Sequence, residues 1–568
     1  MLEYLRSPRS KWWLPLLVVL SLAAGLGLRD PSPPDEPRFV LAAQHMVASG
    51  DWLVPHRGRE FYAEKPPVFM WLLASAQRVM QDWRTAFLLP SLLAGLATLW
   101  LTWDLAARLW GRRLAPYAAG ALWVCLQFGL QAKRAQIDMV LVFMTTLSLW
   151  GILRHLLKGP AWGSLWLGAF AAGVGTVTKG VGFLPLLLLL PWAIAYRTMP
   201  STRFADEKVA WRWLLFALAF AAGTAVWLGP LSMALATQDD PALRAYAQEL
   251  LFKQTGQRYA SAWHHVQPPW YFLQVIVTLW LPGALLLPWL LPAWWRRLRR
   301  GDARYLLLLG WSVLVLLFFS ASPGKREVYI FPALPALCLA AAPLLPGLLR
   351  RRGVRRVLLL YLLLLAGAAT LSGAAGLLGL SDWAHRLAGQ RAIPEPAIRT
   401  FLGWLLALGI GGLMLAAICR ARRSAIAVVL FTVLLWAVYG LGLTPALDAN
   451  SSARGLMQAV GKRIGADAEL GMIAWREQNL LQADRPVVDF GFKQPWDAQW
   501  REATAWLAQA PQRRWLFVLD EALSPCVDRA RSVAIGQSNR RNWLLVPGAA
   551  MKSGCVTPSF GDVQERAE

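Results

Sequence analysis

Residues 13–67 read WLPLLVVLSLAAGLGL (13–28) followed by RDPSPPDEPRFVLAAQHMVASGDWLVPHRGREFYAEKPP (29–67). The first part is an apolar run, and because no small-residue cleavage site follows it, we expect a retained membrane anchor rather than a signal peptide. The second part keeps four charged side chains beside the membrane, namely Asp35, Glu36, Glu64 and Lys65. Charges in such a place need a use, so we interpret this loop as one wall of a functional site.

The composition indicates a membrane protein. Hydrophobic residues make up 56% of the chain and charged residues 16%, and apolar stretches recur between short basic clusters. The net charge of +25 could suggest nucleic acid, but the basic residues sit in short loops, so we predict no nucleic-acid partner. We place about thirteen transmembrane helices, near residues 13–28, 84–107, 115–130, 138–157, 163–178, 182–197, 212–229, 270–293, 304–320, 327–349, 356–379, 400–419 and 424–442.

Every second loop between these helices is basic. The basic loops cover residues 108–113, 154–158, 197–212, 296–304, 350–356 and 420–423. Since Lys and Arg concentrate in cytoplasmic loops, we predict a multi-pass membrane protein with a cytoplasmic N-terminus. The other loops then face outside, where the chemistry would lie, at residues 29–83, 131–138, 178–182, 232–269, 320–327 and 381–399.

The last part of the chain has a different character. Apolar spans cease, and short strand-like runs at 470–475, 487–490, 515–519 and 543–546 alternate with helical stretches. We predict that residues 443–568 form a small α/β domain on the external side. Cys526 and Cys555 both fall in this part, so a disulfide is permitted there but not required.

Two carboxylates stand out as candidates for chemistry. Asp35 precedes a stretch with helical spacing, so it is read either as an N-cap or as a catalytic group, and the two readings do not exclude each other. Asp138 lies at the apolar margin of a span, where an ionisable group is costly unless it has a task. No CxxC or HExxH spacing occurs in the chain, so the sequence predicts no metal motif of these kinds.

Several segments of the chain resemble a known family. The stretches DEPRF (35–39), SGDWLVP (49–55) and YAEKPP (62–67) are similar to the first external loop of bacterial lipid A aminoarabinose transferases and the related protein O-mannosyltransferases. These are polyprenyl-phosphate-dependent glycosyltransferases of the GT-C fold. Further stretches match in the same order: Ile137-Asp138, Thr178-Lys179-Gly180, Lys325 and Tyr329 in SPGKREVYIFPALP, and, more weakly, Gln257-Arg258-Tyr259.

The resemblance implies a fold and a set of roles. It implies an α-helical GT-C membrane domain over residues 1–442, with external loops 29–83 and 232–269, in a bacterial inner (cytoplasmic) membrane whose outer side faces the periplasm. Such an enzyme moves a sugar from a polyprenyl (undecaprenyl) phosphate donor, with inversion, to an acceptor such as lipid A. Cations would stabilise the departing phosphate and a carboxylate would orient or deprotonate the acceptor. The implied residues are Asp35 and Asp138 for catalysis, Lys65, Arg258, Lys325 and Tyr329 for the donor phosphate, and Glu36, Tyr62, Glu64 and Lys179 in support.

The chain also departs from the family pattern. The resemblance implies a His about five residues before Arg258 that would hold a metal together with Glu64, but Lys253 stands there. This departure argues against a bound divalent ion but leaves it open, and no other cofactor is predicted. The long external loop and the last third of the chain are otherwise unlike the family, so the identity of the sugar and of the acceptor stays open.

The sequence leaves several alternative functions open. Within the enzymes, a protein O-mannosyltransferase or a polysaccharide-decorating transferase stays open. A lipid or sugar transporter or flippase would predict ionisable residues at mid-span, but such charges are few, Asp104 and Arg108 near a cytoplasmic end being typical. A scaffold or sensor would leave the EKPP and TKG stretches unexplained.

Overall fold

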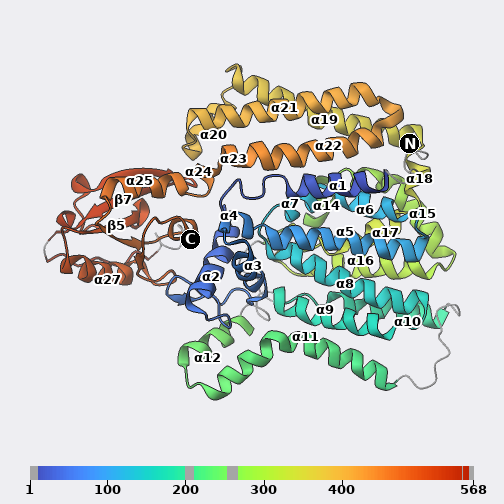
Figure 1. Ribbon diagram of the computed structural model, residues 1–568, viewed down its shortest axis with the longest axis horizontal. Coiled ribbons are helices and arrows are strands. Elements are labelled where there is room, and N and C mark those ends of the chain that lie inside the picture. The colour runs from blue at the N-terminus through green and yellow to red at the C-terminus, as the bar shows by residue number, and fades with distance from the viewer. Residues whose placement is uncertain (1–9, 199–209, 252–265, 553, 562–568) are drawn as a thin grey trace.

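The computed structural model describes residues 10–198, 210–251, 266–552 and 554–561. Most of these residues form a helical bundle, with the N-terminus at one end and a β-sheet from the C-terminal part at the other (Figure 1). Within the described ranges, seven helices are long and apolar enough to cross a membrane, which makes the chain a multi-pass membrane protein. They are Trp83–Trp110, Ile137–Lys158, Ala210–Thr237, Ala303–Ala321, Arg352–Leu377, Glu395–Cys419 and Ala421–Ala446.

Several of the thirteen predicted spans are shorter or broken. The predicted span 270–293 is a pair of helical segments, Tyr271–Leu279 and Gly283–Arg299, bent by 100° at a break that contains Pro282, a residue without a backbone N–H. The predicted span 115–130 consists of two short helices, α6 (Ala115–Trp123) and α7 (Leu126–Ala132). Apolar run length alone could not distinguish these broken segments from straight spans.

The helices of the bundle pack both on chain neighbours and on distant helices. The main ones are α1 (Ser10–Ala23), α5 (Leu89–Trp110), α8 (Ile137–Lys158), α9 (Trp162–Lys179), α10 (Leu189–Thr198), α11 (Ala210–Thr237), α15 (Leu287–Arg299), α16 (Ala303–Ala321), α17 (Ala333–Ala341), α19 (Arg352–Leu377), α21 (Glu395–Cys419) and α22 (Ser424–Val438). Helix α8 packs between α5 and α9, while α19, α21 and α22 form a separate layer (Figure 1). Helices distant in the chain also meet, since α1 contacts α22 and α10 contacts α16. Gly151 lets α8 approach α9 closely, because a Cβ there would lie 2.1 Å from the carbonyl oxygen of Ser164.

The loop predicted as the first external loop, residues 29–83, is itself structured. It contains α2 (Glu36–Ser49), α3 (Val68–Met80), α4 (Trp83–Ala86) and a small hairpin of β1 (His56–Arg57) and β2 (Glu60–Phe61). The helical spacing that follows Asp35 is confirmed, since Phe39, Val40 and Met46 lie on the buried face of α2. Helix α2 thereby fixes the position of the acidic residues at its start.

The C-terminal part contains a five-stranded mixed sheet. Its strands are β3 (Glu469–Ile473), β4 (Val487–Asp489), β5 (Arg514–Leu519), β6 (Val533–Ser538) and β7 (Arg541–Pro547), in the order β4-β3-β5-β7-β6. Helices α25 (Arg454–Ile464), α26 (Glu477–Leu481) and α27 (Trp496–Gln509) accompany it. Strands β3 and β5 are parallel neighbours, whereas β7 runs antiparallel to both β5 and β6.

Four of these strands match the predicted runs, and β6 was missed. Its sequence, VAIGQS, is partly exposed and contains Gly536, where the register with β7 shifts, so it lacks a clear apolar alternation. The permitted disulfide is present, because Cys526 and Cys555 are bonded with their Cα atoms 5.4 Å apart. This bond ties the segment after the sheet back to the loop that follows β5.

Candidate active site

Asp35 lies at the entrance to α2, but it does not cap that helix. Its side chain makes no hydrogen bond to the first-turn amides. Instead, the carboxylate accepts from Arg326 Nη2 at 2.9 Å and from Gln136 Nε2 at 3.2 Å. The N-cap interpretation of Asp35 is therefore wrong, and the carboxylate is turned toward side chains from two other loops.

The charges around Asp35 keep it ionised. Burial alone would raise the pKa of this carboxyl group, but Arg326, and then Arg38 and Lys179, outweigh burial and hold the pKa below its usual value. The side chain retains 13% exposure. Asp35 is thus a partly accessible carboxylate that accepts hydrogen bonds and has low basicity.

Asp138 and Lys179 form a second charged pair next to the first. Asp138, in the first turn of α8, accepts from the Lys179 ammonium at the end of α9. The same ammonium lies 5.2 Å from the ring centroid of Tyr329. Because Arg326 is influenced by the charges of both Asp35 and Asp138, the structure brings these predicted residues into one cluster.

The EKPP stretch forms the neighbouring wall. The Glu64 carboxylate accepts from Arg57 at 3.1 Å and from Arg38 at 3.5 Å, and although burial raises its pKa, these cations hold it below the usual value. Tyr62 is buried, with the Arg57 guanidinium 5.3 Å from its ring centroid. The Lys65 ammonium donates to the Glu64 carbonyl oxygen at 3.0 Å, just before the prolines that lead into α3.

Glu36 has a different environment from its neighbour Asp35. Its carboxylate accepts from Arg29 at 2.5 and 2.7 Å, and from the backbone amides of Ser32 and Ala135, each at 2.9 Å. Burial raises its pKa, but Arg29 and these amides lower it overall. Glu36 therefore ties the first external loop to the loop that leads into α8, and this is a structural role.

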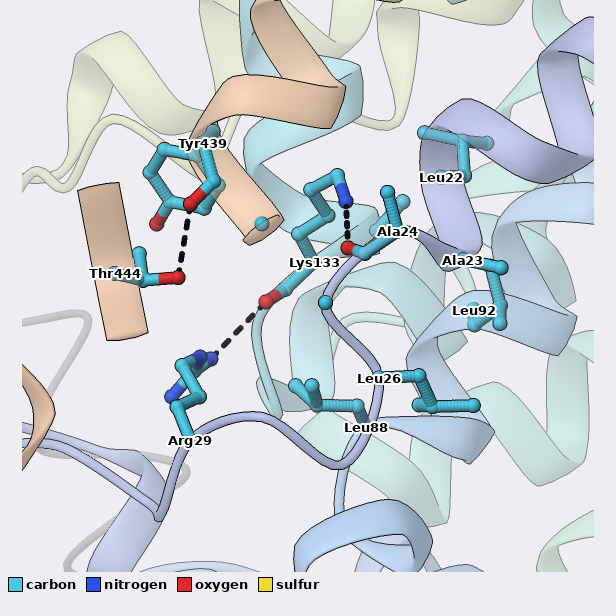
Figure 2. A pocket seen from close by; sticks show the side chains of 13 residues that line it. Leu22, Ala23, Ala24, Leu26, Arg29, Leu88, Leu92, Lys133, Tyr439 and Thr444 are labelled. Carbon is cyan, nitrogen blue, oxygen red and sulfur yellow. Dashed lines mark hydrogen bonds between the residues drawn. The ribbon is translucent and has the colours of Figure 1, made fainter. Parts of the chain in front are cut away.

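A small cavity lies next to Arg29, the partner of Glu36, and is lined also by Lys133 and Tyr439. Figure 2 shows Arg29 donating to the Lys133 carbonyl oxygen, at 3.1 Å, and the Lys133 ammonium donating to the Ala24 carbonyl oxygen, at 2.6 Å. Lys133 is 5% exposed, and no carboxylate of the described ranges forms an ion pair with it. Burial, followed by the Arg29 charge, lowers the pKa of Lys133 to about 7.

Two predicted phosphate-binding residues are not placed in the cluster. The Lys325 ammonium is buried and donates to the carbonyl oxygens of Ser322 and Gln267, at 2.6 and 3.2 Å, so it holds its own loop in place. Arg258, like Lys253, lies outside the described residues.

Sequence reasoning missed three cations and one acid of this site. Arg326 directly follows the predicted Lys325 and binds Asp35, while Arg38, inside the DEPR stretch, reaches both Glu64 and Glu477. Arg57 also binds Glu477, at 3.3 Å. Glu477 begins α26 in the C-terminal part, so that part contacts the site directly. The basic residues inside the quoted motifs were a usable signal, but nothing local marked Glu477.

The described residues do not fit a divalent metal at Glu64. Its two nearest partners are guanidinium groups, and no group of three His, Cys, Asp or Glu residues suited to a metal occurs in the part of the chain that the structure describes. The guanidiniums of Arg57 and Arg38 bind the Glu64 oxygens that a divalent ion would need as ligands.

Comparison with known proteins supports a relationship over most of the chain. Residues 64–227 match the family described as dolichyl-phosphate-mannose-protein mannosyltransferase. An undecaprenyl phosphate-alpha-4-amino-4-deoxy-L-arabinose arabinosyl transferase 1 of Pseudomonas fluorescens is 30% identical over 78% of this chain and 77% of its own length. A second P. fluorescens enzyme of the same name is 32% identical, but there the alignment spans only about half of the relative, 53%.

A further relative and a solved structure extend the similarity. The corresponding transferase of Edwardsiella ictaluri is 28% identical over 84% of this chain and 86% of its own length. The crystal structure of ArnT from Cupriavidus metallidurans bound to undecaprenyl phosphate superimposes with a TM-score of 0.72, covering 95% of this chain and 98% of that one, at 21% identity. This confirms the predicted helical GT-C fold. The predicted resemblance is confirmed as well, and the chain belongs to the family of undecaprenyl phosphate-alpha-4-amino-4-deoxy-L-arabinose arabinosyl transferases.

Proposed function

We propose that this protein is an integral-membrane glycosyltransferase that moves a sugar of the aminoarabinose type from undecaprenyl phosphate to lipid A. Family membership supports the donor class. The observation that carries the proposal is the cluster in which Asp35 and Asp138 meet Arg326, Lys179 and Tyr329. A transfer between two phosphorylated lipids needs this combination of acceptor-facing carboxylates and nearby cations.

In the proposed reaction, an acceptor oxygen attacks the anomeric carbon from the face opposite the donor phosphate. The bond between that carbon and the phosphate oxygen breaks, and the electron pair leaves with undecaprenyl phosphate, so the configuration inverts. Lys65, Arg258 and Tyr329 would bind the donor phosphate and stabilise the charge that develops on it. Asp138, paired with Lys179, would keep that ammonium beside Tyr329.

The electrostatics of Asp35 favour a phosphate acceptor. A carboxylate whose pKa lies below its usual value is a weak base, so it suits an acceptor that is already anionic better than a hydroxyl group that must be deprotonated. Arg326 and Arg38 beside Asp35 would offset the repulsion between the carboxylate and the incoming phosphate. Asp35 would then position the acceptor and stabilise positive charge on the sugar.

The membrane arrangement is part of the proposal. We infer about thirteen spans over residues 1–442, a cytoplasmic N-terminus, and a periplasmic α/β domain over residues 443–568. The N-terminus and the sheet lie at opposite ends of the bundle, which supports this orientation (Figure 1). A reporter that is active only in the cytoplasm, fused after Glu568, should be silent. Activity of that reporter would mean that a span was miscounted.

Mass spectrometry of lipid A tests the function directly. Cells with the gene should carry a mass increment of a substituted aminopentose on lipid A phosphate, and cells without it, or with Asp35→Asn, should not. Purified protein should also consume undecaprenyl phosphate-aminoarabinose only when lipid A is present. Unchanged lipid A together with altered glycoproteins would instead identify a protein mannosyltransferase, the second candidate, which the family match over residues 64–227 favours.

A further inference from the structure

A second, larger cavity opens at a part of the molecule that the proposed reaction does not use. Its volume is about 350 Å³, within the range of cavities that hold small ligands. It is lined by Arg108 near the end of α5, by Arg154 and Lys158 in the last turns of α8, and by the turn 159–161 that leads into α9. Its lining is therefore basic.

The cavity lies a membrane thickness away from the candidate active site. Helix α8 begins at the site, where Asp138 pairs with Lys179, and ends at the cavity with Lys158. A helix rises 1.5 Å per residue, so these two ends are about 30 Å apart, which matches the hydrocarbon core of a bilayer. Since α8 is one of the candidate membrane spans, the cavity sits at the opposite membrane interface from Asp35.

Two of the three cations around this cavity form no ion pair with a carboxylate of the described residues. Asp104 is already occupied, because it accepts from Arg108 at 2.5 and 3.1 Å and from Trp150 Nε1 at 2.7 Å. Arg154 donates to the neutral Ser164 hydroxyl at 2.9 Å. Among the residues with described positions, no carboxylate forms an ion pair with Arg154 or Lys158. Three cations and one carboxylate leave two positive charges facing the cavity.

An indole ring holds two of these cations in place. The guanidiniums of Arg108 and Arg154 lie 5.8 and 5.3 Å from the ring centroid of Trp150. Trp150 is itself 9% exposed and is fixed by its bond to Asp104. A surface Arg that only extends into the headgroup layer would not need such support. The arrangement is typical of a site that keeps guanidiniums ready for an anion.

We propose that this cavity binds the phosphate group of an anionic membrane lipid, with Arg154 and Lys158 as its main cations. Soluble phosphate has the same binding chemistry, but a basic cavity between transmembrane helices at the bilayer surface lies within reach of lipid headgroups, which favours the lipid. If the proposed orientation holds, this is the cytoplasmic leaflet. The site is independent of the transfer reaction, so neither proposal depends on the other.

Native mass spectrometry of the full-length protein in detergent tests this proposal. We expect wild-type protein to retain one phosphatidylglycerol and to gain thermal stability when phosphatidylglycerol is added, but not with phosphatidylcholine or inorganic phosphate. The double variant Arg154→Gln/Lys158→Gln should bind phosphatidylglycerol roughly thirtyfold more weakly, as expected for the loss of two cations near a lipid surface. Its transfer activity, normalised to folded protein, serves as the check that the active site is intact.

The matched control is Arg112→Gln/Arg113→Gln, which removes two exposed cations at the same end of α5 but outside the cavity. This control should retain the lipid, as should the charge-preserving variant Arg154→Lys/Lys158→Arg. If the double variant does not fold, the exposed Lys158→Gln alone carries the test. Equal loss of lipid in the control, full retention in the Gln variants, or equal stabilisation by inorganic phosphate would each overturn the lipid site.

Discussion

Asp35 and Glu36 are neighbours in the sequence, yet they face two different regions of the molecule. Glu36 accepts five hydrogen bonds, two from Arg29, two from backbone amides and one from the Ser32 hydroxyl, and so joins two loops. Among the described residues, Asp35 accepts hydrogen bonds from the side chains of Arg326 and Gln136 and from no backbone amide. Burial and the type of donor, rather than the acidic group itself, therefore separate a residue that stabilises the fold from one that is available for chemistry.

Replacing Asp35 should have the largest effect on activity. Asp35→Asn keeps the size of the side chain, and because no cap bond is lost, the fold should be retained. We expect turnover to fall about a thousandfold, the scale of losing a group that acts on the acceptor, with little change in donor binding or in Tm. Asp51→Asn, an exposed acid of the same loop, should retain full activity. Near wild-type transfer by Asp35→Asn would remove Asp35 from the site.

Replacing Glu36 should give the opposite pattern. Glu36→Gln leaves the Arg29 guanidinium buried without a counter-charge, so we expect a loss of about 3 kcal/mol in unfolding free energy, measured by thermal unfolding in detergent. The folded fraction should keep far more activity than Asp35→Asn.

The control for Glu36 is Glu502→Gln, which breaks an exposed ion pair with Arg59. The two side chains of that pair are 50% and 43% exposed, so the loss should stay below about 1 kcal/mol. If Glu36→Gln and Glu502→Gln destabilised the protein equally, the contrast between Asp35 and Glu36 would lose its basis in burial.

The sequence predicted what local patterns encode. The helical spacing after Asp35 and four of the strands follow from runs of neighbouring residues, and the structure contains both. The DEP, EKPP and TKG stretches are also local patterns, and the roles of their residues stay a prediction. The bend at Pro282 was not predicted, because an apolar run reads the same whether the helix is straight or broken.

Long-range partners could not be predicted in the same way. Arg326 lies 291 positions from Asp35, and Glu477 lies 420 positions from Arg57, so only the tertiary fold brings these charges together. Lys325 illustrates the converse. It was predicted for its charge, but its ammonium is used by backbone carbonyls, while the adjacent Arg326 faces the carboxylates. The backbone conformation decides which of these two neighbouring cations faces the carboxylates, and the sequence alone does not show that conformation.

The next prediction concerns the proposed active site around Asp35, at the cations that would bind the donor phosphate. We expect Lys65→Ala to lower kcat by about a hundredfold and to affect donor binding less, because a cation on a leaving phosphate acts mainly as charge develops. Combining it with Arg258→Ala should reduce activity by less than the product of the two single effects, since the two residues are proposed to share one phosphate. Strictly multiplicative losses in this double-mutant cycle would assign them to separate sites.

The smallest expected effect is on stability, at Lys133, whose carbonyl oxygen accepts from the Glu36 partner Arg29. Its pKa in the folded protein is lowered to about 7 by burial, below that of an unfolded lysine, so protonation favours the unfolded state between these two values. Stability should therefore rise by about 1 kcal/mol per pH unit above pH 7. Lys133→Met should lack this rise. The unfolding free energy of the wild type should therefore increase relative to that of the variant between pH 7 and pH 9. The control Lys462→Met, at an exposed position, should show no such change. If the stability difference between wild type and Lys133→Met stayed constant with pH, the Lys133 ammonium would have to remain protonated beside the Arg29–Glu36 pair.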